Sequence, residues 1–600
     1  MSELKERKEI DIADTWDLST LFVDDEAFET ALNEVDPCIQ LISSFKGKLN
    51  TAENIYSYLK QSTDLKVAMD NIFGYASLRK SEDTRDTKAQ SMYSRAYGKY
   101  VSVMAASAFA QPEILSLSQE ELDSLVASPV LKDFKFYLED MIRAKAHTLS
   151  AAEEGILAKF QEVLKNPEEV SNMLMDADMV FDAVEDSEGK KHELSGSNYI
   201  LLQTSPDRVL RQNAFKSFYK SYQQHINTLA STYSGCVNEA VIEAKIRNYD
   251  SSREMALDAN HIPTTVYDNL IDTVHKRMDL MYRYVRLRKR MLGLDELHYY
   301  DLYTPLCQDS TKHYTYQQAQ EMVLEAVKPL GEEYVGRVKR AYQDRWIDVY
   351  PNKGKSGGAY SAGTYTSNPF ILTNFTGTLD SVSTLAHEMG HSQHTWLTNH
   401  TQPAQYADYS LFVAEVASTV NENLLIEQML EKETDPANRM ALLNQYLEGF
   451  KGTVYRQTMF AEFEKEAHAL KESGASLTAD ALNEIYEKLV KEYFGQDLVW
   501  DDAVKYEWAR IPHFYALFYV YVYATGYSSA CAISEGILSG KQDAVKNYLE
   551  FLSMGSSAYP LDELKHAGVD LTTPKPIDIA LDKFEKVLED AEKTAEKLGM

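Results

Sequence analysis

The sequence His-Glu-Met-Gly-His at residues 387–391 holds three side chains with the spacing of a metal-dependent hydrolase. Residues four apart lie on one face of a helix, so His387 and His391 can present their imidazoles to the same ion. Glu388 lies beside the first histidine, within reach of a water molecule on that ion, where a carboxylate can act as general base. Two ligands, one base and an open coordination position indicate hydrolysis assisted by a metal.

A catalytic zinc ion usually has three protein ligands, so a third must come from elsewhere in the chain. His394 follows His391 by three residues, but a rise of about 1.5 Å per residue places it roughly 10 Å along the axis from His387. Glu415 is the better choice, because it lies in an apolar run, 411–422, where an unpaired carboxylate would be costly. Two alternatives stay open: Glu415 in a structural ion pair, and His394 as a direct ligand.

Imidazoles that bind a metal usually donate their second N–H to a carboxylate or a carbonyl. Glu422 lies two turns after Glu415 and Ser418 one turn after it, so both can support the ligands. Asp380 is also acidic, but the residues around it are typical of a helix start, so we expect it to cap the helix. These three residues and His394 are predicted to surround the ligands, with His394 either supporting them or facing the substrate.

The motif at 387–394 and the pattern E-x-x-S-x-x-x-E at 415–422 resemble the thimet-oligopeptidase-like zinc metallopeptidases. Within that family the chain is most similar to the oligoendopeptidase F branch. Runs at 358–360, 369–375 and 511–515 add to the resemblance, which covers most of the chain. The resemblance implies a mainly α fold, in which two helical lobes surround a deep central channel.

The resemblance also implies the composition of the site. It assigns one Zn²⁺ to His387, His391 and Glu415, and it makes Glu388 the general base. The residues do not fix the metal absolutely, since cobalt or manganese can occupy similar ligands.

A tyrosine-rich segment, 506–527, follows later in the chain and contains six tyrosines. Most of them are expected to pack in an aromatic core. When water attacks a peptide carbonyl, negative charge develops on oxygen, and donors aimed at that oxygen lower the barrier. The family resemblance implies this role for His513, Tyr519 and Tyr523, with Tyr515 as an alternative to either tyrosine.

The segment 364–375 is β-branched and aromatic, and it therefore predicts a strand just before the metal helix. An edge strand at this place could pair with the backbone of an extended peptide, although a purely structural hairpin is an equal alternative. Nearby glycines indicate a mobile loop. The predicted substrate-binding residues are Gly358, Ala359, Tyr360 and Phe370.

Composition narrows the classes of partner. The net charge of −30 disfavours binding to nucleic acid or to an anionic membrane, so short peptides are the expected partners. The four cysteines contain no C-x-x-C pair, and the N-terminus is charged without an apolar h-region, so we expect a soluble, cytoplasmic protein. The oligomeric state stays open.

Few glycines and prolines in 600 residues favour long helices. We expect a helical N-terminal lobe over 1–204, with a β-hairpin near 178–197, and a catalytic domain over 205–600. A small β-sheet is expected next to the zinc helix.

The sequence thus predicts a zinc-dependent endopeptidase that hydrolyses short oligopeptides through a zinc-activated water, with Glu388 as general base. One alternative is a carboxypeptidase-like zinc exopeptidase, in which Arg510 would bind a terminal carboxylate. A second alternative is a non-catalytic helical protein that binds peptides, against which the intact Glu388 argues.

Overall fold

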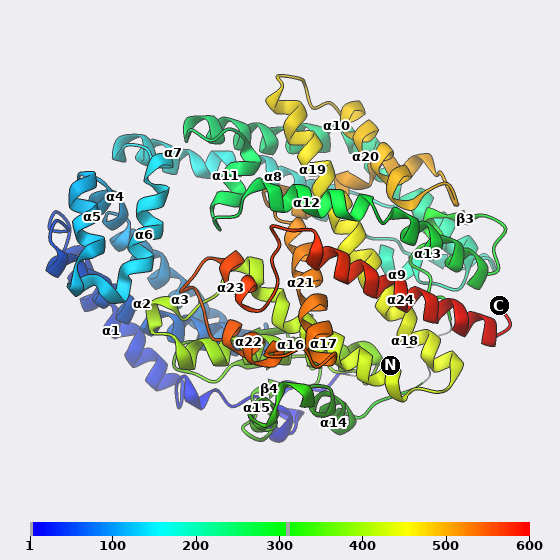
Figure 1. Cartoon of the computed structure of the whole chain (residues 1–600), viewed down its shortest axis with the longest axis horizontal. Helices are drawn as coiled ribbons and strands as arrows, with labels where there is room; N and C mark the ends of the chain where they lie inside the picture. Colours follow the sequence, from blue (N-terminus) through cyan, green and yellow to red (C-terminus); the bar gives the residue numbers. More distant parts are fainter. Residues whose placement is uncertain (1–3, 308–311) are drawn as a thin grey trace. The chain divides into compact units, whose positions relative to one another are not determined.

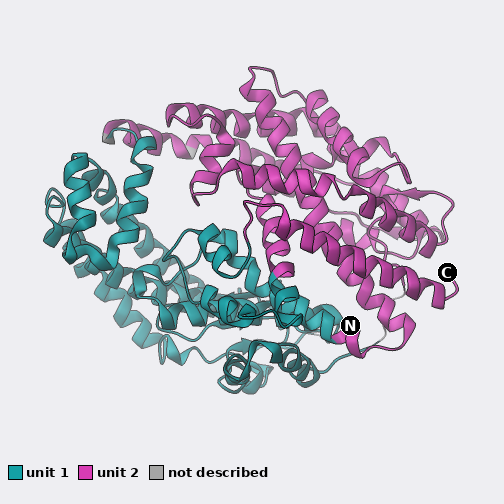
Figure 2. Cartoon of the chain, in the orientation of Figure 1, with its two compact units in different colours: residues 1–151, 312–428, 533–569 teal, residues 152–311, 429–532, 570–600 magenta. Residues whose placement is uncertain are grey.

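The computed structural model describes residues 4–307 and 312–600, and this part of the chain is mostly helical (Figure 1). Strands form only small sheets, so the predicted mainly α fold is confirmed. The chain divides into two compact units (Figure 2): unit 1 is 1–151, 312–428 and 533–569, and unit 2 is 152–311, 429–532 and 570–600. None of the helices in the described part has the length and apolar content that a membrane-spanning segment requires.

Unit 1 contains the helix with the His-Glu-Met-Gly-His motif. Its first stretch folds into α1 (Asp25–Ser43), α2 (Ala52–Glu82), α3 (Thr87–Ser107), α4 (Ala110–Leu115), α5 (Gln119–Ala127) and α6 (Lys135–Arg143). Its other stretches supply α14 (Tyr316–Ala326), α15 (Glu332–Gln343), α16 (Leu379–Thr401), α17 (Leu411–Lys432), α22 (Ala544–Phe551) and α23 (Pro560–His566). Three helices continue from one unit into the other: α17, α21 (Tyr521–Leu538) and α7 (Ala151–Leu164), of which only Ala151 belongs to unit 1.

A three-stranded sheet precedes α16 in unit 1. Its strand order is β4 (Ile347–Asp348), β6 (Phe370–Leu372) and β5 (Tyr360–Ala362). β4 is parallel to β6, with Asp348 opposite Leu372, and β5 is antiparallel to it, with Tyr360 opposite Leu372. β5 and β6 both contact α16, which confirms the small sheet predicted beside this helix. β6 is much shorter than the strand segment predicted over 364–375.

The N-terminal helices and this sheet share one hydrophobic core. Phe28 and Leu59 are buried in the same cluster as Phe370 and Leu372. Each such side chain contributes roughly 1.5–3 kcal/mol through burial. Because core contacts rather than chain order define the units, the structure divides the chain after residue 151, and not after residue 204 as the sequence predicts.

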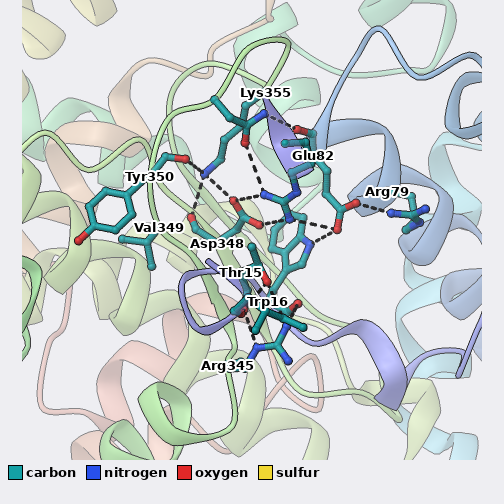
Figure 3. Close-up of polar contacts among 12 residues, drawn as sticks. Thr15, Trp16, Arg79, Glu82, Arg345, Asp348, Val349, Tyr350 and Lys355 are labelled. Carbon is teal, nitrogen blue, oxygen red and sulfur yellow. Dashed lines mark hydrogen bonds and ion pairs between the residues drawn. The ribbon is translucent and has the colours of Figure 1, made fainter. Parts of the chain in front are cut away.

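A buried network of charged side chains ties the N-terminal segment to β4 (Figure 3). Asp348 accepts a hydrogen bond from Arg7 Nη1 at 2.9 Å and pairs with Lys355 Nζ at 2.6 Å. Glu82, at the end of α2, accepts from Trp16 Nε1 at 2.7 Å. Buried charges are tolerated only when they are paired in this way. The network therefore fixes the register of the N-terminal segment against the sheet.

Unit 2 is also helical. Its helices are α7 (Ala151–Leu164), α8 (Asn166–Met173), α9 (Tyr199–Gln203), α10 (Arg208–Ile246), α11 (Ser252–Asp258), α12 (Thr264–His275), α13 (Met278–Met291), α18 (Pro436–Gly449), α19 (Arg456–Glu472), α20 (Ala479–Phe494) and α24 (Lys575–Lys597). β1 (Val184–Glu185) and β2 (Lys191–His192) form the predicted hairpin, and β3 (Leu297–His298) pairs with β7 (Leu498–Val499).

Candidate metal centre

His387 and His391 lie on one long helix, α16. The N-cap of this helix is Thr378, whose Oγ1 accepts a hydrogen bond from the Ser381 N–H at 3.2 Å. The prediction that Asp380 caps the helix is therefore wrong. Asp380 lies in the first turn, where its negative charge interacts favourably with the helix dipole.

The predicted ligand atoms of His387, His391 and Glu415 lie together. The two Nε2 atoms are 3.2 Å apart, and Glu415 Oε2 is 3.4 Å from each of them. Two ligands of a tetrahedral ion with bonds of about 2.0–2.1 Å are about 3.3–3.4 Å apart, so the three atoms match one face of such a tetrahedron. Among the residues that the structure describes, this is the only group of three His, Cys, Asp or Glu side chains whose ligand atoms all lie within 4.8 Å of one another.

The third atom reaches this position because α16 and α17 touch at Gly390. A Cβ on Gly390 would lie 2.4 Å from the Ala417 carbonyl oxygen and 2.6 Å from Ser418 Cα. One turn beyond, Asn421 Nδ2 donates to the Ala386 carbonyl at 3.1 Å and ties the two helices together. A residue without a side chain is thus required inside the motif for α17 to approach α16.

We expect Gly390→Ala to destabilise the protein by about 1–3 kcal/mol, because the added methyl group must push α16 and α17 apart. Metal affinity should fall as well, since α17 carries Glu415. Chemical denaturation and metal titration would measure the two effects. Gly98→Ala is the matched control: Gly98 is exposed inside α3 and has nothing within 4 Å of its added Cβ, so this change should not lower stability. Equal losses in both variants would contradict the packing explanation.

Two further side chains of α17 contact the ligands. Glu422 Oε1 is 3.3 Å from His387 Nδ1, and Ser418 Oγ donates to Glu415 Oε2 at 2.9 Å. Such contacts orient a ligand and fix which imidazole nitrogen is free. Both contacts support the roles predicted for Glu422 and Ser418.

The charges of the centre perturb one another strongly in the metal-free protein. Burial favours neutral His387, but the hydrogen bond and charge of Glu422, with the other carboxylates, raise its pKa to about 9. Burial also opposes ionisation of Glu415, yet His391 above all brings its pKa to about 2. Burial raises the pKa of Glu388, against the influence of both histidines. Glu388 Oε2 is buried and has no hydrogen-bond partner in the described part of the chain.

His394 lies in a buried, aromatic environment. Its ring is 1% exposed and stacks on Tyr409, with centroids 3.7 Å apart and planes at 5°, while Phe551 lies 5.5 Å away. Burial lowers the pKa of His394 to about 3, so the ring is neutral, and its Nδ1 has no partner among the described residues. Of the two predicted roles, these contacts favour the supporting one for His394.

β5 runs beside the metal helix. Ser361 Oγ is 2.8 Å from the Oγ of Ser392, the residue after His391, and this hydrogen bond links β5 to α16. β5 is an edge strand of its sheet, and Gly358 and Ala359 lead into it. The sequence predicts the peptide-pairing edge strand within 364–375, but the strand in that segment, β6, is central, so this prediction is wrong and the edge is formed by β5 instead.

Phe370 is the exception among the predicted substrate-binding residues. Its side chain is fully buried in the core of unit 1 and meets the Trp16 ring edge-on, with centroids 6.3 Å apart. The prediction that Phe370 contacts substrate is wrong, because β6 is the central strand and its side chains pack inward.

The three predicted oxyanion residues form one group in unit 2. His513 is exposed on the short 3₁₀ helix Pro512–Tyr515, and its ring centroid is 6.0 Å from that of Tyr523. Tyr519 and Tyr523 have centroids 5.3 Å apart. Tyr515, the alternative, instead shares a hydrogen bond of 2.8 Å with Thr232 of α10. The roles of the three residues in catalysis stay predictions.

Arg510 is engaged within unit 2. Its Nη2 pairs with Glu507 at 2.7 Å and its Nε donates to the Tyr219 hydroxyl at 3.2 Å. Glu507 is fully buried, and Arg456 and Arg510 help to keep its pKa low despite that burial. These contacts favour a structural role for Arg510 over the binding of a terminal carboxylate.

Three features of the centre lie outside the residues predicted from sequence: Gly390, Asn421 and the Ser361–Ser392 hydrogen bond. A glycine in a buried helix is itself a sign of close packing. Asn421 is polar within the apolar run of α17, which is a weaker sign. No feature of the sequence pairs Ser361 with Ser392.

The chain is similar to known peptidases. A family model described as peptidase family M3 matches residues 201–583, and one described as oligopeptidase F matches 113–181. The chain is 42% identical to oligopeptidase PepF of Bacillus subtilis, over 100% of this chain and 89% of that protein. It is 40% identical to group B oligopeptidase PepB of Streptococcus agalactiae, over 97% of each chain. The structure of oligoendopeptidase-F from Enterococcus faecium is similar with a TM-score of 0.75 and 36% identity, covering 96% of this chain and 99% of that one.

Proposed function

The chain belongs to peptidase family M3 and is a metalloendopeptidase of the oligoendopeptidase F branch, and we propose that it hydrolyses short oligopeptides with one zinc ion and Glu388 as general base. The observation that carries the proposal is the arrangement of His387, His391 and Glu415, whose donor atoms have the mutual distances of tetrahedral zinc ligands. Zinc, when bound, would lower the pKa of a water molecule and polarise the scissile carbonyl.

In this proposal Glu388 moves the proton. Its side chain is 5% exposed, and its free Oε2 is available to accept a proton from the attacking water. Burial raises its pKa, so the carboxylate is a stronger base than a solvated one. The same carboxyl then returns the proton to the leaving amine, which departs neutral.

We further propose that His513, Tyr519 and Tyr523 donate hydrogen bonds to the carbonyl oxygen as its negative charge develops. Their grouping on one segment of unit 2 supports a joint role. The edge strand β5 would pair with the substrate backbone, which would give binding with little dependence on sequence. The relatives are named oligopeptidases, which supports short peptides as substrates.

A set of peptides blocked at both ends tests this function against the exopeptidase alternative. An endopeptidase should cleave acetylated, amidated peptides at internal bonds, because it needs neither free terminus. Mass spectrometry of products from peptides of increasing length would show the bonds cut and the size limit. If only unblocked peptides were cut, one residue at a time, the endopeptidase proposal would be wrong.

A further inference from the structure

The segment that carries His513 and Tyr519 contains a strained turn at Phe518. Three successive backbone hydrogen bonds run along it: Ala516 N–H to His513 O at 3.0 Å, Tyr519 N–H to Ala516 O at 3.1 Å, and Val522 N–H to Tyr519 O at 3.0 Å. Phe518 occupies the third position of the middle turn with φ of 48°, in the left-handed region. Glycine is the usual residue there, and a bulky side chain needs support from its surroundings.

Glu464 of α19 provides part of that support. Its Oε1 accepts a hydrogen bond from the Phe518 N–H at 2.6 Å, and this N–H takes no part in the three backbone hydrogen bonds. The Phe518 ring is 2% exposed and packs against His468, with centroids 4.6 Å apart, and against Tyr267 at 5.7 Å. The hydrogen bond to Glu464 and the packing of the Phe518 ring therefore hold the turn in place.

The surroundings of Glu464 disfavour a negative charge on its carboxyl group. Its side chain is fully buried, and its Oε2 has no partner among the described residues. The titratable groups that face it are Tyr233 and Cys236 of α10 and Tyr267 of α12, which are uncharged at neutral pH. Burial raises the pKa of Glu464 far above that of a solvated carboxyl, and the Phe518 N–H only partly offsets this.

We propose that Glu464 is a positioning residue of the peptidase, which pins the Phe518 turn and so fixes where His513 and Tyr519 present their donors. The proposal rests on the catalytic role proposed above for these two residues. The hydrogen bond from Phe518 N–H to Glu464 lies within the turn that Tyr519 closes by donating to Ala516 O. His513 is joined to the start of the same turn, because its carbonyl accepts from Ala516 N–H. The position of the turn therefore sets the positions of both residues.

The pair Glu464→Gln and Glu464→Met tests this idea. Glutamine keeps an uncharged acceptor for the Phe518 N–H, so its kcat should stay within about threefold of the wild type, whereas methionine fills similar volume without an acceptor. Because a misplacement of about 1 Å can cost about 100-fold, we expect kcat of Glu464→Met to fall at least about tenfold with little change in KM. An unchanged kcat in Glu464→Met would overturn the proposal. So would an equally large loss in Glu464→Gln, which would show that a charge is needed.

Amide hydrogen exchange separates the position of the turn from its use in catalysis. Exchange of the Phe518 amide should be faster in Glu464→Met than in the wild type and should stay slow in Glu464→Gln. Rapid exchange in Glu464→Gln would by itself refute the proposal that Glu464 holds the turn. The test is therefore informative even if the methionine variant folds poorly. Tyr455→Phe is the control: it removes another buried hydrogen bond of unit 2, from Tyr455 Oη to Arg277 O at 2.8 Å, and should change neither exchange at Phe518 nor kcat.

Two variants of the segment itself distinguish failure of this inference from failure of the proposed function. If His513→Ala and Tyr519→Phe kept full kcat, the catalytic role of the segment would be refuted, and with it the purpose assigned to Glu464. If both lost activity while Glu464→Met did not, only the positioning role would fail. In the expected case, Glu464→Met adds little to the loss already caused by Tyr519→Phe, because both act through the same hydroxyl.

Discussion

Glu388→Gln is expected to lower kcat by about 10²–10⁴-fold without loss of bound metal. Glutamine keeps the volume of the side chain but cannot accept the proton of the attacking water. The ligand atoms of His387, His391 and Glu415 are untouched by the change, so metal content, measured by elemental analysis, should equal that of the wild type. Steady-state kinetics on an internally quenched peptide would give the size of the loss.

The same variant should not be less stable. Glu388 is buried near two other carboxylates, and a raised pKa means that its ionised form is disfavoured in the folded protein. Above that pKa the charge lowers the free energy of unfolding, so replacing it with a neutral amide should leave the Tm of the metal-free protein unchanged or higher.

Substantial residual hydrolysis in Glu388→Gln, with metal bound and contaminating peptidase excluded, would remove Glu388 from the mechanism.

Glu415→Ala is expected to abolish activity by releasing the metal. It deletes one of three ligand atoms and leaves His387 and His391 without the carboxylate that lies 3.4 Å from both. Metal affinity should fall by far more than the about 10–100-fold that is typical when only a supporting residue is lost. Competition with a chelator of known affinity would measure the change. In the wild type, chelation should stop hydrolysis and added zinc should restore it.

Glu422→Ala and Ser418→Ala provide the graded controls. Each contacts a ligand but is not itself predicted to bind metal, so each should weaken affinity by about 10–100-fold and keep measurable activity at saturating zinc. If Glu422→Ala released the metal as completely as Glu415→Ala, this test would not distinguish the two carboxylates. The assignment of Glu415 as the third ligand would then have to be reconsidered.

The candidate metal ligands could be predicted from sequence because the signal for each of them is local. The spacing of His387 and His391 follows from the periodicity of one helix, and Glu415 stood out as a carboxylate among apolar neighbours. The small sheet beside α16 and the hairpin near residue 190 were also predictable from local patterns of apolar and turn residues. In each case the signal lies within about ten residues of chain.

The errors arose where packing between distant segments decides the outcome. Phe370 belongs to a central strand only because β4 and β5 flank it, and residue spacing near 370 does not show this. The choice between the two roles predicted for His394 likewise depends on Tyr409 and Phe551, distant residues whose rings pack against it. The predicted boundary after residue 204 followed the order of the chain, whereas α1–α6 share their core with a sheet some 200 residues later.

The network around Asp348 has a consequence for the synthesis of this protein. Arg7 and Asp348 are 341 residues apart, so the N-terminal segment leaves the ribosome long before its partner exists. At roughly 5–20 residues per second, the delay is roughly 20–70 s. Throughout that interval Trp16 also lacks the ring of Phe370, which packs against it in the folded protein. Until β4 emerges, the nascent chain therefore lacks Asp348 as a partner of Arg7, and only Glu82 is available to pair with that guanidinium.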